Sequence, residues 1–326
     1  MAKTEKDIHA QGAKGPSPLQ EIDEGWAYLG GRFVPFAEAQ VSLFTHALHY
    51  GTGCFEGIRA YWNEIRKDLF VLRMEDHYRR FRQSAAMLRI DDLGSAQELG
   101  EITIELLRRS NPRQDVYIRP IAFKASRVIK VGLSGLRNEL AVLAVPMGDY
   151  VSTTGLSVQV SAWRRISDTA MPSRSKITGS YVNIALAVDE ARQNGYDEAL
   201  LLNDDGHLSE GSGSNVFVVR RGEVSTPPIT ADILEGITRD VAMALLRAKG
   251  LRVTERPIDR TELYVADEVF LTGTGAQIAP VTSVDRRPVG TGEIGPITRD
   301  LQETYFRAVR GDDGRYASWL TPVYRS

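Results

Sequence analysis

The stretch SRSKITGSYVN, residues 173–183, is rich in small polar side chains and leads into an apolar helical pattern that runs to Asn194. A lysine in such a stretch is usually solvated on the protein surface. Two neighbours favour another role for Lys176. Gly179 permits the close approach of a second backbone, and the phenol of Tyr181 can face the same pocket. Lys176 is therefore a candidate for a lysine that takes part in chemistry.

A second loop of small residues, HLSEGSGSNVF (207–217), carries the carboxylate of Glu210. Glycines and serines after a strand most simply form a turn. Glycines also let a backbone close tightly around a ligand, and a partly buried carboxylate can hold a pyridine nitrogen in its protonated form. A lysine and an acid in separate small-residue loops are the two groups that a pyridoxal phosphate cofactor requires.

An anion site is expected at LEGITRD (234–240), where a glycine precedes the start of a helix. The amides of Ile237 and Thr238 have no partner within the helix and lie at its positive end. Thr274, between two glycines in LTGTGAQ, adds a hydroxyl, and Arg80 adds a cation with bidentate geometry. Each of these signals is common in proteins without such a site, so it is their combination that predicts a phosphate.

The composition is typical of a globular protein with small-molecule partners. Hydrophobic residues make up 42% and charged residues 25% of the chain, unlike the composition of disordered proteins. The formal charge is -2 and no basic block suggests nucleic acid or a membrane surface. The single cysteine, Cys54, excludes an internal disulfide, and five scattered histidines give no metal-ligand spacing. We expect no metal, and a reducing cytoplasm fits best.

Two domains are expected, because 326 residues exceed the usual span of one hydrophobic core. Residues 1–20 are polar, lack an apolar segment of signal-peptide length and are predicted to be a mobile tail. No stretch approaches the eighteen or so apolar residues of a membrane helix. Glycines and small polar residues in MGDYVSTTGL (147–156) indicate an interdomain connection. The predicted division is a small domain at 21–148, a connection at 149–156 and a large domain at 157–326.

Local patterns predict the elements of both domains. The glycine pair at 30–31 predicts a hairpin, and Ser95 with Glu98 predicts a capping box at a helix start. Strand-like runs lie at 26–29, 32–36, 116–125, 139–147, around 158, and at 198–202, 215–219 and 268–271. Helical patterns lie at 75–89, after 95, and at 181–194, 238–249 and 298–309. A turn at 204–206 is predicted to separate the strands at 198–202 and 215–219.

Seven segments stand in the order of a known family. They are HALHYGTGCFEGIRAY (46–61), EDHYRRF (75–81), VYIRP (116–120), SKITGSYVN (175–183), HLSEGSGSNVF (207–217), TPPITADILEGITRD (226–240) and ADEVFLTGTGAQIAPV (266–281). They closely resemble the class IV aminotransferases of fold type IV, and within them the branched-chain amino acid aminotransferases. The resemblance covers about residues 24 to 310.

The resemblance implies a two-domain α+β fold of the D-amino acid aminotransferase type. A small α/β N-terminal domain is followed by a larger β-barrel-like domain, with pyridoxal 5'-phosphate between them. It also implies a homodimer, or a higher oligomer built from dimers, whose active site borrows residues from the partner.

For the cofactor, the resemblance implies that Lys176 forms the Schiff base, Tyr181 bonds the phenolic oxygen and Glu210 pairs with the pyridine nitrogen. Leu234 would pack against the ring. The phosphate would be held by Arg80, Ile237, Thr238 and Thr274.

For the substrate, the resemblance implies an apolar pocket lined by Tyr50, Phe55 and Tyr150, with Val131 reaching across the dimer. Tyr117 and Arg119 match positions that handle carboxylates, and Arg119 suits the distal carboxylate of glutamate. The turn at Thr274 and Gly275 would receive the α-carboxylate.

The chain departs from the family pattern in places that put the substrate range in doubt. Met147 stands where the bacterial subgroup often has tryptophan, and methionine makes a softer pocket wall. Gly275 stands where alanine is common, and Ser214 replaces an acidic residue. The loop 126–136 lacks the expected glycine and proline content and carries two cations, Arg127 and Lys130.

The implied reaction transfers amino groups from leucine, isoleucine and valine to 2-oxoglutarate, giving branched-chain 2-keto acids and L-glutamate. D-amino acid transaminase, (R)-amine transaminase and aminodeoxychorismate lyase share the cofactor site and are alternatives, and a non-catalytic binding protein with this fold is another. Arg119 in VYIRP together with HALHYGTGCFEGIR favours the branched-chain interpretation.

Overall fold

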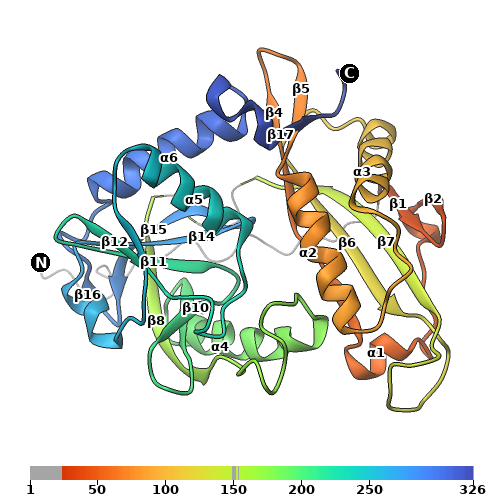
Figure 1. Ribbon diagram of the computed structural model, residues 1–326, viewed down its shortest axis with the longest axis horizontal. Coiled ribbons are helices and arrows are strands. Elements are labelled where there is room, and N and C mark those ends of the chain that lie inside the picture. Colours follow the sequence, from red (N-terminus) through yellow and green to blue (C-terminus); the bar gives the residue numbers. More distant parts are fainter. Residues whose placement is uncertain (1–23, 149–151, 153, 326) are drawn as a thin grey trace, which may run out of the picture.

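The computed structural model describes residues 24–148, 152 and 154–325. The chain forms two lobes, each built around one β-sheet, with the first lobe on the right in Figure 1 and the second on the left. The predicted tail at 1–20 lies outside the described residues, as do Asp149 and Tyr150 in the predicted connection.

The sheet of the first lobe has eight strands, all paired antiparallel. They are β1 (Trp26–Leu29), β2 (Arg32–Pro35), β3 (Gly53–Phe55), β4 (Ile58–Asn63), β5 (Asp68–Leu72), β6 (Val116–Lys124), β7 (Asn138–Pro146) and β17 (Leu320–Pro322). Their order is β17-β5-β4-β6-β7-β1-β2, and β3 pairs with β6. The last strand therefore returns from the far end of the chain to the edge of the first sheet.

The sheet of the second lobe has nine strands and is mixed. They are β8 (Leu156–Arg164), β9 (Glu198–Leu202), β10 (Leu208–Gly211), β11 (Asn215–Arg220), β12 (Glu223–Thr226), β13 (Val253–Glu255), β14 (Glu268–Gly273), β15 (Gln277–Val284) and β16 (Arg287–Pro288). The order is β10-β9-β8-β15-β14-β11-β12-β13, with β16 on β15. Strand β8 runs parallel to both neighbours, β9 and β15, and β12 runs parallel to β13.

Six α-helices and four short 3₁₀ helices complete the described chain. The α-helices are α1 (His46–Tyr50), α2 (Met74–Met87), α3 (Ala96–Ser110), α4 (Tyr181–Gln193), α5 (Ile237–Ala248) and α6 (Pro296–Val309). The 3₁₀ helices are η2 (Phe36–Glu38), η3 (Thr178–Ser180), η4 (Arg260–Val265) and η5 (Gly314–Trp319). Among the described residues, no helix has the length and apolar character needed to cross a membrane.

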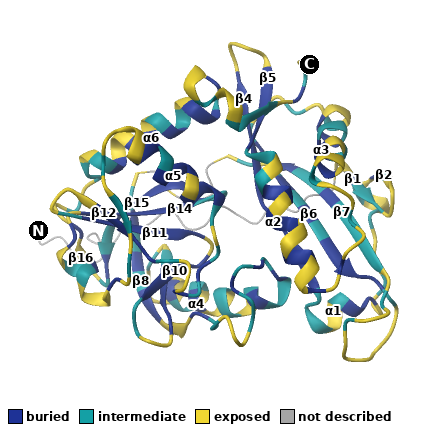
Figure 2. Cartoon of the chain, viewed as in Figure 1, coloured by how far each residue is buried: buried dark blue, intermediate teal, exposed yellow. Residues whose placement is uncertain are grey.

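Hydrophobic packing holds the lobes together as well as filling each one. Figure 2 shows that buried residues follow the strands of both sheets and one side of α2, whose other side is exposed. One buried cluster joins Tyr61 and Leu72 of the first sheet to Phe217 and Tyr305 of the second lobe. The hydroxyls of Tyr61 and Tyr305 lie 2.8 Å apart with no exposed surface, so the contact satisfies two buried polar groups.

The expected two-domain α+β fold is confirmed, and most predicted elements lie within a few residues of the observed ones. The capping box at Ser95 and Glu98 is present. The predicted turn at 204–206 is present between the strands at 198–202 and 215–220. The turn at 204–206 joins β9 to the short strand β10, which the sequence analysis did not anticipate, and β10 then leads to β11. The predicted division at 21–148, 149–156 and 157–326 stays a prediction.

Candidate active site

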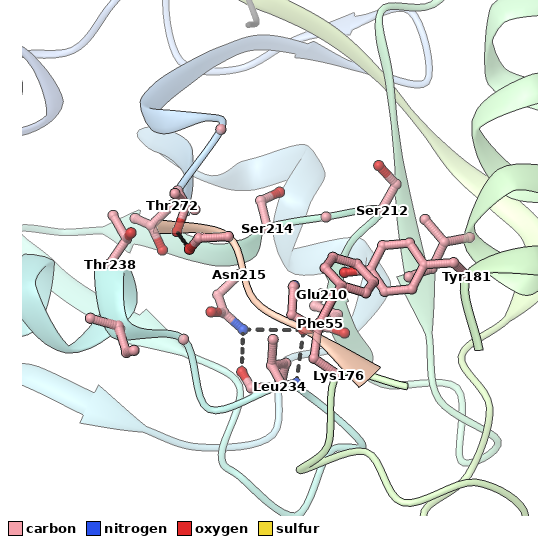
Figure 3. A pocket seen from close by; sticks show the side chains of 18 of the residues that line it. Phe55, Lys176, Tyr181, Glu210, Ser212, Ser214, Asn215, Leu234, Thr238 and Thr272 are labelled. Atoms are coloured by element: carbon pink, nitrogen blue, oxygen red, sulfur yellow. Dashed lines mark hydrogen bonds between the residues drawn. The ribbon is translucent and has the colours of Figure 1, made fainter. Parts of the chain in front are cut away.

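A cavity of about 210 Å³ is lined by residues of both lobes. Thirteen of the residues predicted from the sequence line it: Phe55, Arg80, Tyr117, Arg119, Met147, Lys176, Tyr181, Glu210, Leu234, Ile237, Thr238, Thr274 and Gly275. Figure 3 shows Lys176, Phe55 and Tyr181 toward one side of this cavity and Thr238 and Thr272 toward the other. The cavity therefore has an aromatic side and a hydroxyl-rich side.

Lys176 lies on the aromatic side, just before η3. Its Nζ is 5.3 Å from the ring centre of Phe55 and 5.4 Å from that of Tyr181. These two rings pack on each other with centres 4.7 Å apart. The backbone amide of Lys176 donates a hydrogen bond to Ser84 Oγ at 3.0 Å, and its carbonyl accepts one from Phe55 N at 3.0 Å. The lysine thus extends from a backbone that is fixed on both sides.

Glu210, at the end of β10, is buried among donors (Figure 3). Its Oε1 lies 2.8 Å from Arg165 Nε, and its Oε2 accepts hydrogen bonds from Leu234 N at 3.0 Å and Asn215 Nδ2 at 3.2 Å. Burial raises the pKa of Glu210 above its ordinary value, although Arg165, Leu234 N–H and Lys176 oppose this. Glu210 also lines the cavity, where a carboxylate can accept a further hydrogen bond from an N–H.

Arg80 lies at the other end and is paired with a residue that the sequence analysis missed. Its Nε and Nη2 donate to the two oxygens of Glu56 at 2.7 and 2.8 Å, and its Nη1 donates to the carbonyl of Glu235 at 2.7 Å. His77 Nδ1 lies 2.9 Å from Glu56 Oε2. Burial opposes ionisation of Glu56, but Arg80 and His77 outweigh it and hold its pKa well below the usual range. The guanidinium is therefore fixed at the edge of the cavity.

The start of α5 closes this end. Gly236 is its N-cap, and a Cβ at Gly236 would lie 1.9 Å from Asn215 Oδ1, so the close approach requires glycine. The first amides of α5, at Ile237 and Thr238, have no acceptor within the helix. Thr274, also predicted here, donates its hydroxyl to the carbonyl of Gly57 at 3.0 Å.

Two buried hydroxyls at this end test whether a phosphate fits. Ser214 Oγ and Thr272 Oγ1 line the cavity and have no hydrogen-bond partner among the described residues. Buried hydroxyls without partners are costly unless a ligand satisfies them. Together with the amides of α5 they form a set of neutral donors for a phosphate, and Glu210 suits a protonated pyridine nitrogen. The residues present therefore fit pyridoxal phosphate.

Arg119 and Tyr117 form a further part of the cavity wall. The guanidinium of Arg119 lies 4.1 Å from the ring centre of Phe55, and its Nη2 donates to Tyr117 Oη at 2.7 Å. Burial raises the pKa of Tyr117, against the effect of Arg119. A Cβ at Gly57 would lie 2.3 Å from Tyr117 Oη, so glycine there gives the phenol its space. This wall combines apolar surface with a cation.

Three predicted substrate residues are not part of this cavity. Tyr50, at the end of α1, packs on His46 with ring centres 4.6 Å apart and does not line the cavity. Val131 is 80% exposed and lies in the loop before β7. Tyr150 lies outside the described residues. The chain by itself therefore supplies only part of the predicted substrate pocket.

Arg165 and Asn215, which hold Glu210, were not predicted from the sequence. Asn215 stands in the segment that was singled out for Glu210, and an amide after a run of glycine and serine was an available signal. Arg165, in WRRI, has no local pattern that separates it from a surface arginine. Its role depends on where β8 ends relative to β10.

A lysine, a buried carboxylate and an anion cradle in one cavity between two lobes are the features of a pyridoxal-phosphate enzyme. The chain belongs to the family described as Amino-transferase class IV, which matches residues 53–284.

Among its relatives, a probable branched-chain-amino-acid aminotransferase of Aquifex aeolicus (strain VF5) is 49% identical over 94% of this chain and 99% of its own length. The branched-chain-amino-acid aminotransferase of Escherichia coli (strain K12) is 36% identical over 91% of this chain and 97% of its own.

Solved structures agree in fold. The branched-chain aminotransferase of Thermoproteus uzoniensis with norvaline has a TM-score of 0.89 at 42% identity and covers 92% of this chain and 100% of its own. The branched-chain amino acid aminotransferase of Thermobaculum terrenum in its PLP form has a TM-score of 0.88 at 40% identity and covers 94% and 100%.

Proposed function

We propose that this chain is a branched-chain amino acid aminotransferase. It uses pyridoxal 5'-phosphate to transfer amino groups from L-leucine, L-isoleucine and L-valine to 2-oxoglutarate. The observation that carries the proposal is the single cavity that joins Lys176, Glu210 and Arg119. These residues supply a base, an acceptor for a pyridine N–H and a cation for a carboxylate, which this reaction needs. The relatives named above support the branched-chain substrate class.

Pyridoxal phosphate, when bound, accepts the electron pair that remains on the substrate when its α-proton is removed. Lys176 holds the cofactor through its amine, and as a free amine it takes the α-proton and later returns it. Glu210 would hold a proton on the pyridine nitrogen of a bound cofactor, because a carboxylate stabilises the protonated ring. Arg165, the Leu234 backbone amide and the Asn215 side-chain amide orient its oxygens.

The remaining roles follow the donors and surfaces around the cavity. Leu234 would pack on the ring, Tyr181 would donate to the phenolic oxygen, and Arg80, Ile237, Thr238 and Thr274 would hold the phosphate. Phe55, Met147 and Tyr117 exclude water from the leucine side chain. Arg119 binds the distal carboxylate of glutamate, and the turn at Thr274 and Gly275 receives the α-carboxylate.

A homodimer is part of the proposal. Six apolar residues are exposed on and before α1 and in the adjoining loop: Val41, Leu43, Phe44, Leu48, Ile129 and Val131. We name them the α1 patch. Backbone contacts between Thr45 and Arg127 and between His46 and Ser126 join its two segments. Clustered exposed apolar side chains mark protein interfaces, and a second copy at this patch would bring its Tyr50 and Val131 to a site that lacks them.

The location and the domain division complete the proposal. Cys54 is buried and free, which suits a reducing cytoplasm. The small domain spans 21–148 and the large domain 157–326, with residues 149–156 between them.

The test is the replacement of Lys176 by alanine. Loss of the proton shuttle alone should lower the rate by about 10² to 10⁴-fold, and loss of the cofactor linkage should remove the rest. The assay follows conversion of L-leucine with 2-oxoglutarate, beside D-alanine and (R)-1-phenylethylamine. Turnover of the variant near the native rate, without added amines, would overturn the assignment, and a native preference for D-alanine or the amine would replace the branched-chain substrate.

A further inference from the structure

The backbone that carries Lys176 is fastened to the first lobe, although its sequence runs between β8 and α4 of the second. The Lys176 amide donates to Ser84 Oγ, and its carbonyl accepts from Phe55 N, both at 3.0 Å. Ser84 lies on α2 and Phe55 on β3. Ile177 also bridges to Cys54 of β3. The position of the lysine is thus set by α2 and β3.

The residues that follow Lys176 are pinned to the same lobe. Thr178 Oγ1 lies 2.9 Å from the carbonyl oxygen of Gly51 and 3.0 Å from that of Gly53. A Cβ at Gly51 would lie 2.8 Å from Gly179 Cα, so the two backbones touch. On the other side of Lys176, by contrast, the segment from Arg165 to Ser175 contains no strand or helix. That segment is held by turns, among them the one in which Ser175 N donates to the Pro172 carbonyl at 3.2 Å, and the hydrogen bond to Ser84 is the contact that fixes the Lys176 amide itself.

Ser84 stands one helical turn after Arg80 on the buried face of α2. Arg80 reaches the anion end of the cavity, where its Nη1 donates to the carbonyl of Glu235. Ser84 has no exposed surface and reaches the backbone of Lys176. One rigid turn of helix thus connects the anion end with the lysine.

We propose that Ser84 is a positioning residue for Lys176. By fixing the Lys176 amide, Ser84 sets the point from which the amine reaches the substrate α-carbon, and through α2 it ties that point to the anion end near Arg80. The inference rests on the proposed role of Lys176. Ser84 does not touch the cofactor or the substrate, since it does not line the cavity.

The expected effect is on proton transfer and not on binding. The amine lies at the end of a long side chain, so a small rotation of the Lys176 backbone moves the amine by more, and a misplacement of about 1 Å costs on the order of 10²-fold in rate. Ser84→Ala should lower the single-turnover rate with L-leucine by about 10- to 100-fold and change KM by less than about 2-fold. Ser84→Cys, whose sulfur is a weak acceptor, should have a single-turnover rate between those of the unaltered protein and Ser84→Ala.

Two measurements separate positioning from general damage. The kinetic isotope effect with α-deuterated L-leucine should rise in Ser84→Ala, because proton transfer becomes more rate-limiting. Hydrogen exchange of the cofactor-free protein, followed by mass spectrometry, should show that the peptide containing Lys176 loses protection at one amide. The matched control is Ser225→Ala on β12, a buried serine whose hydroxyl accepts from Arg256 Nε at 3.2 Å and which does not line the cavity. Ser225→Ala should change neither the isotope effect nor the hydrogen exchange of the Lys176 peptide.

Unchanged exchange at the Lys176 peptide in both Ser84 variants would overturn the inference, as would a rate loss equal to that of Ser225→Ala. If Ser84→Ala does not fold, Ser84→Cys decides by the same two measurements. Failure of the proposed function has a different signature, because the unaltered protein would then not convert L-leucine, while the exchange experiment would still report on the bond to Ser84.

Discussion

Arg119 is held against Phe55 by stacking and by its bond to Tyr117, which leaves its buried Nε without a hydrogen-bond partner among the described residues. A guanidinium in this state is suited to a carboxylate. Replacing Arg119 by Leu should raise KM for L-glutamate and 2-oxoglutarate and spare half-reactions of L-leucine. A buried carboxylate without its partner costs roughly 2–5 kcal/mol, and an isobutyl group loses nothing comparable. Single-turnover absorbance measurements with each amino acid test this.

Arg109→Leu is the matched control, because Arg109 pairs with Glu105 on the surface of α3. Arg109→Leu should leave the kinetics with L-leucine and with L-glutamate unchanged. Equal losses for leucine and glutamate in the Arg119 variant would mean that this residue serves the common α-carboxylate. If neither substrate suffers, Arg127 or Lys130 of the loop before β7 binds the distal carboxylate instead.

Glu56 predicts a pH-dependent contribution to stability. Burial disfavours its charge, but Arg80 and His77 hold its pKa well below that of an unfolded glutamate, which titrates near about pH 4.3. The stabilisation is therefore complete above that pH and is lost as the pH falls toward the lower pKa of the folded state. Glu56→Gln should cost roughly 3–5 kcal/mol near neutral pH, because Arg80 stays buried without a charged partner.

Urea unfolding of the cofactor-free protein from pH 7 to pH 3 measures this difference. The difference in unfolding free energy between the unaltered protein and Glu56→Gln should narrow below about pH 4.3. Below that pH the unfolded glutamate binds a proton that the folded Glu56 does not, which lowers the stability of the unaltered protein, and glutamine has no such proton. Glu223→Gln removes a surface partner of Arg252 and should show no measurable gap at any pH. A gap of constant size would mean that Glu56 is not ionised in the fold.

At the scale of the element, α3 begins with a capping box that is exposed to solvent. Glu98 N donates to Ser95 Oγ at 3.1 Å, and Ser95 N donates to Glu98 Oε2 at 2.6 Å. Ser95→Ala removes the first bond and should lower stability by about 1 kcal/mol, seen as a lower midpoint in urea. Ser110→Ala, at the other end of the helix, is the control, because the buried Ser110 hydroxyl has no partner in the described structure. Equal effects of the two changes would show that the cap contributes nothing.

Five of the six α-helices in the described chain were predicted from local sequence, and α1 was not. The apolar spacing of α2, the capping box of α3 and the glycine after α4 are signals carried by neighbouring residues. Short strands such as β3 and β10 were missed, because strands of three or four residues show too few alternations and form only by pairing with distant chain. The parallel pairing of β8 with β15 joins residues more than a hundred positions apart, which no local pattern encodes.

In the site, too, residues in recognisable local segments were predicted, and residues that depend on distant contacts were not. Lys176, Glu210 and the start of α5 stand in small-residue loops whose composition is visible in the sequence. Glu56 and Arg165 are functional only through contacts with Arg80 and Glu210, each reached across the fold. Residues that act through others are therefore the part of the site that requires a structure.

At the scale of the whole molecule, the end of the chain ties the two lobes together. Strand β17 pairs with β5, and Arg310, just after α6, binds Asp115 beside β6 with two donors, at 3.1 and 2.9 Å. Arg310 Nη1 also donates to the carbonyl of Trp62 on β4. Because the cavity takes residues from both lobes, these contacts fix the distance between Arg119 on the first sheet and Glu210 on the second.

In the proposed dimer, a second copy of the chain completes the site. Tyr50 and Val131 lie outside the cavity, and the α1 patch leaves Leu43 and Leu48 exposed. We expect the native protein to sediment at twice the chain mass of 36.1 kDa or at a multiple of the dimer. Replacing Leu43 and Leu48 together by Glu should give a monomer, because two charges cannot be buried in an apolar interface without partners.

This double variant should also lose most of its turnover of L-leucine while its circular dichroism stays native, since each copy then lacks the partner's Tyr50 and Val131. Ile65→Glu is the control, because Ile65 is equally apolar and 89% exposed but lies in the turn between β4 and β5, away from α1 (Figure 1). It should remain dimeric and active. A native protein that is monomeric and fully active would show instead that one chain completes its own substrate pocket.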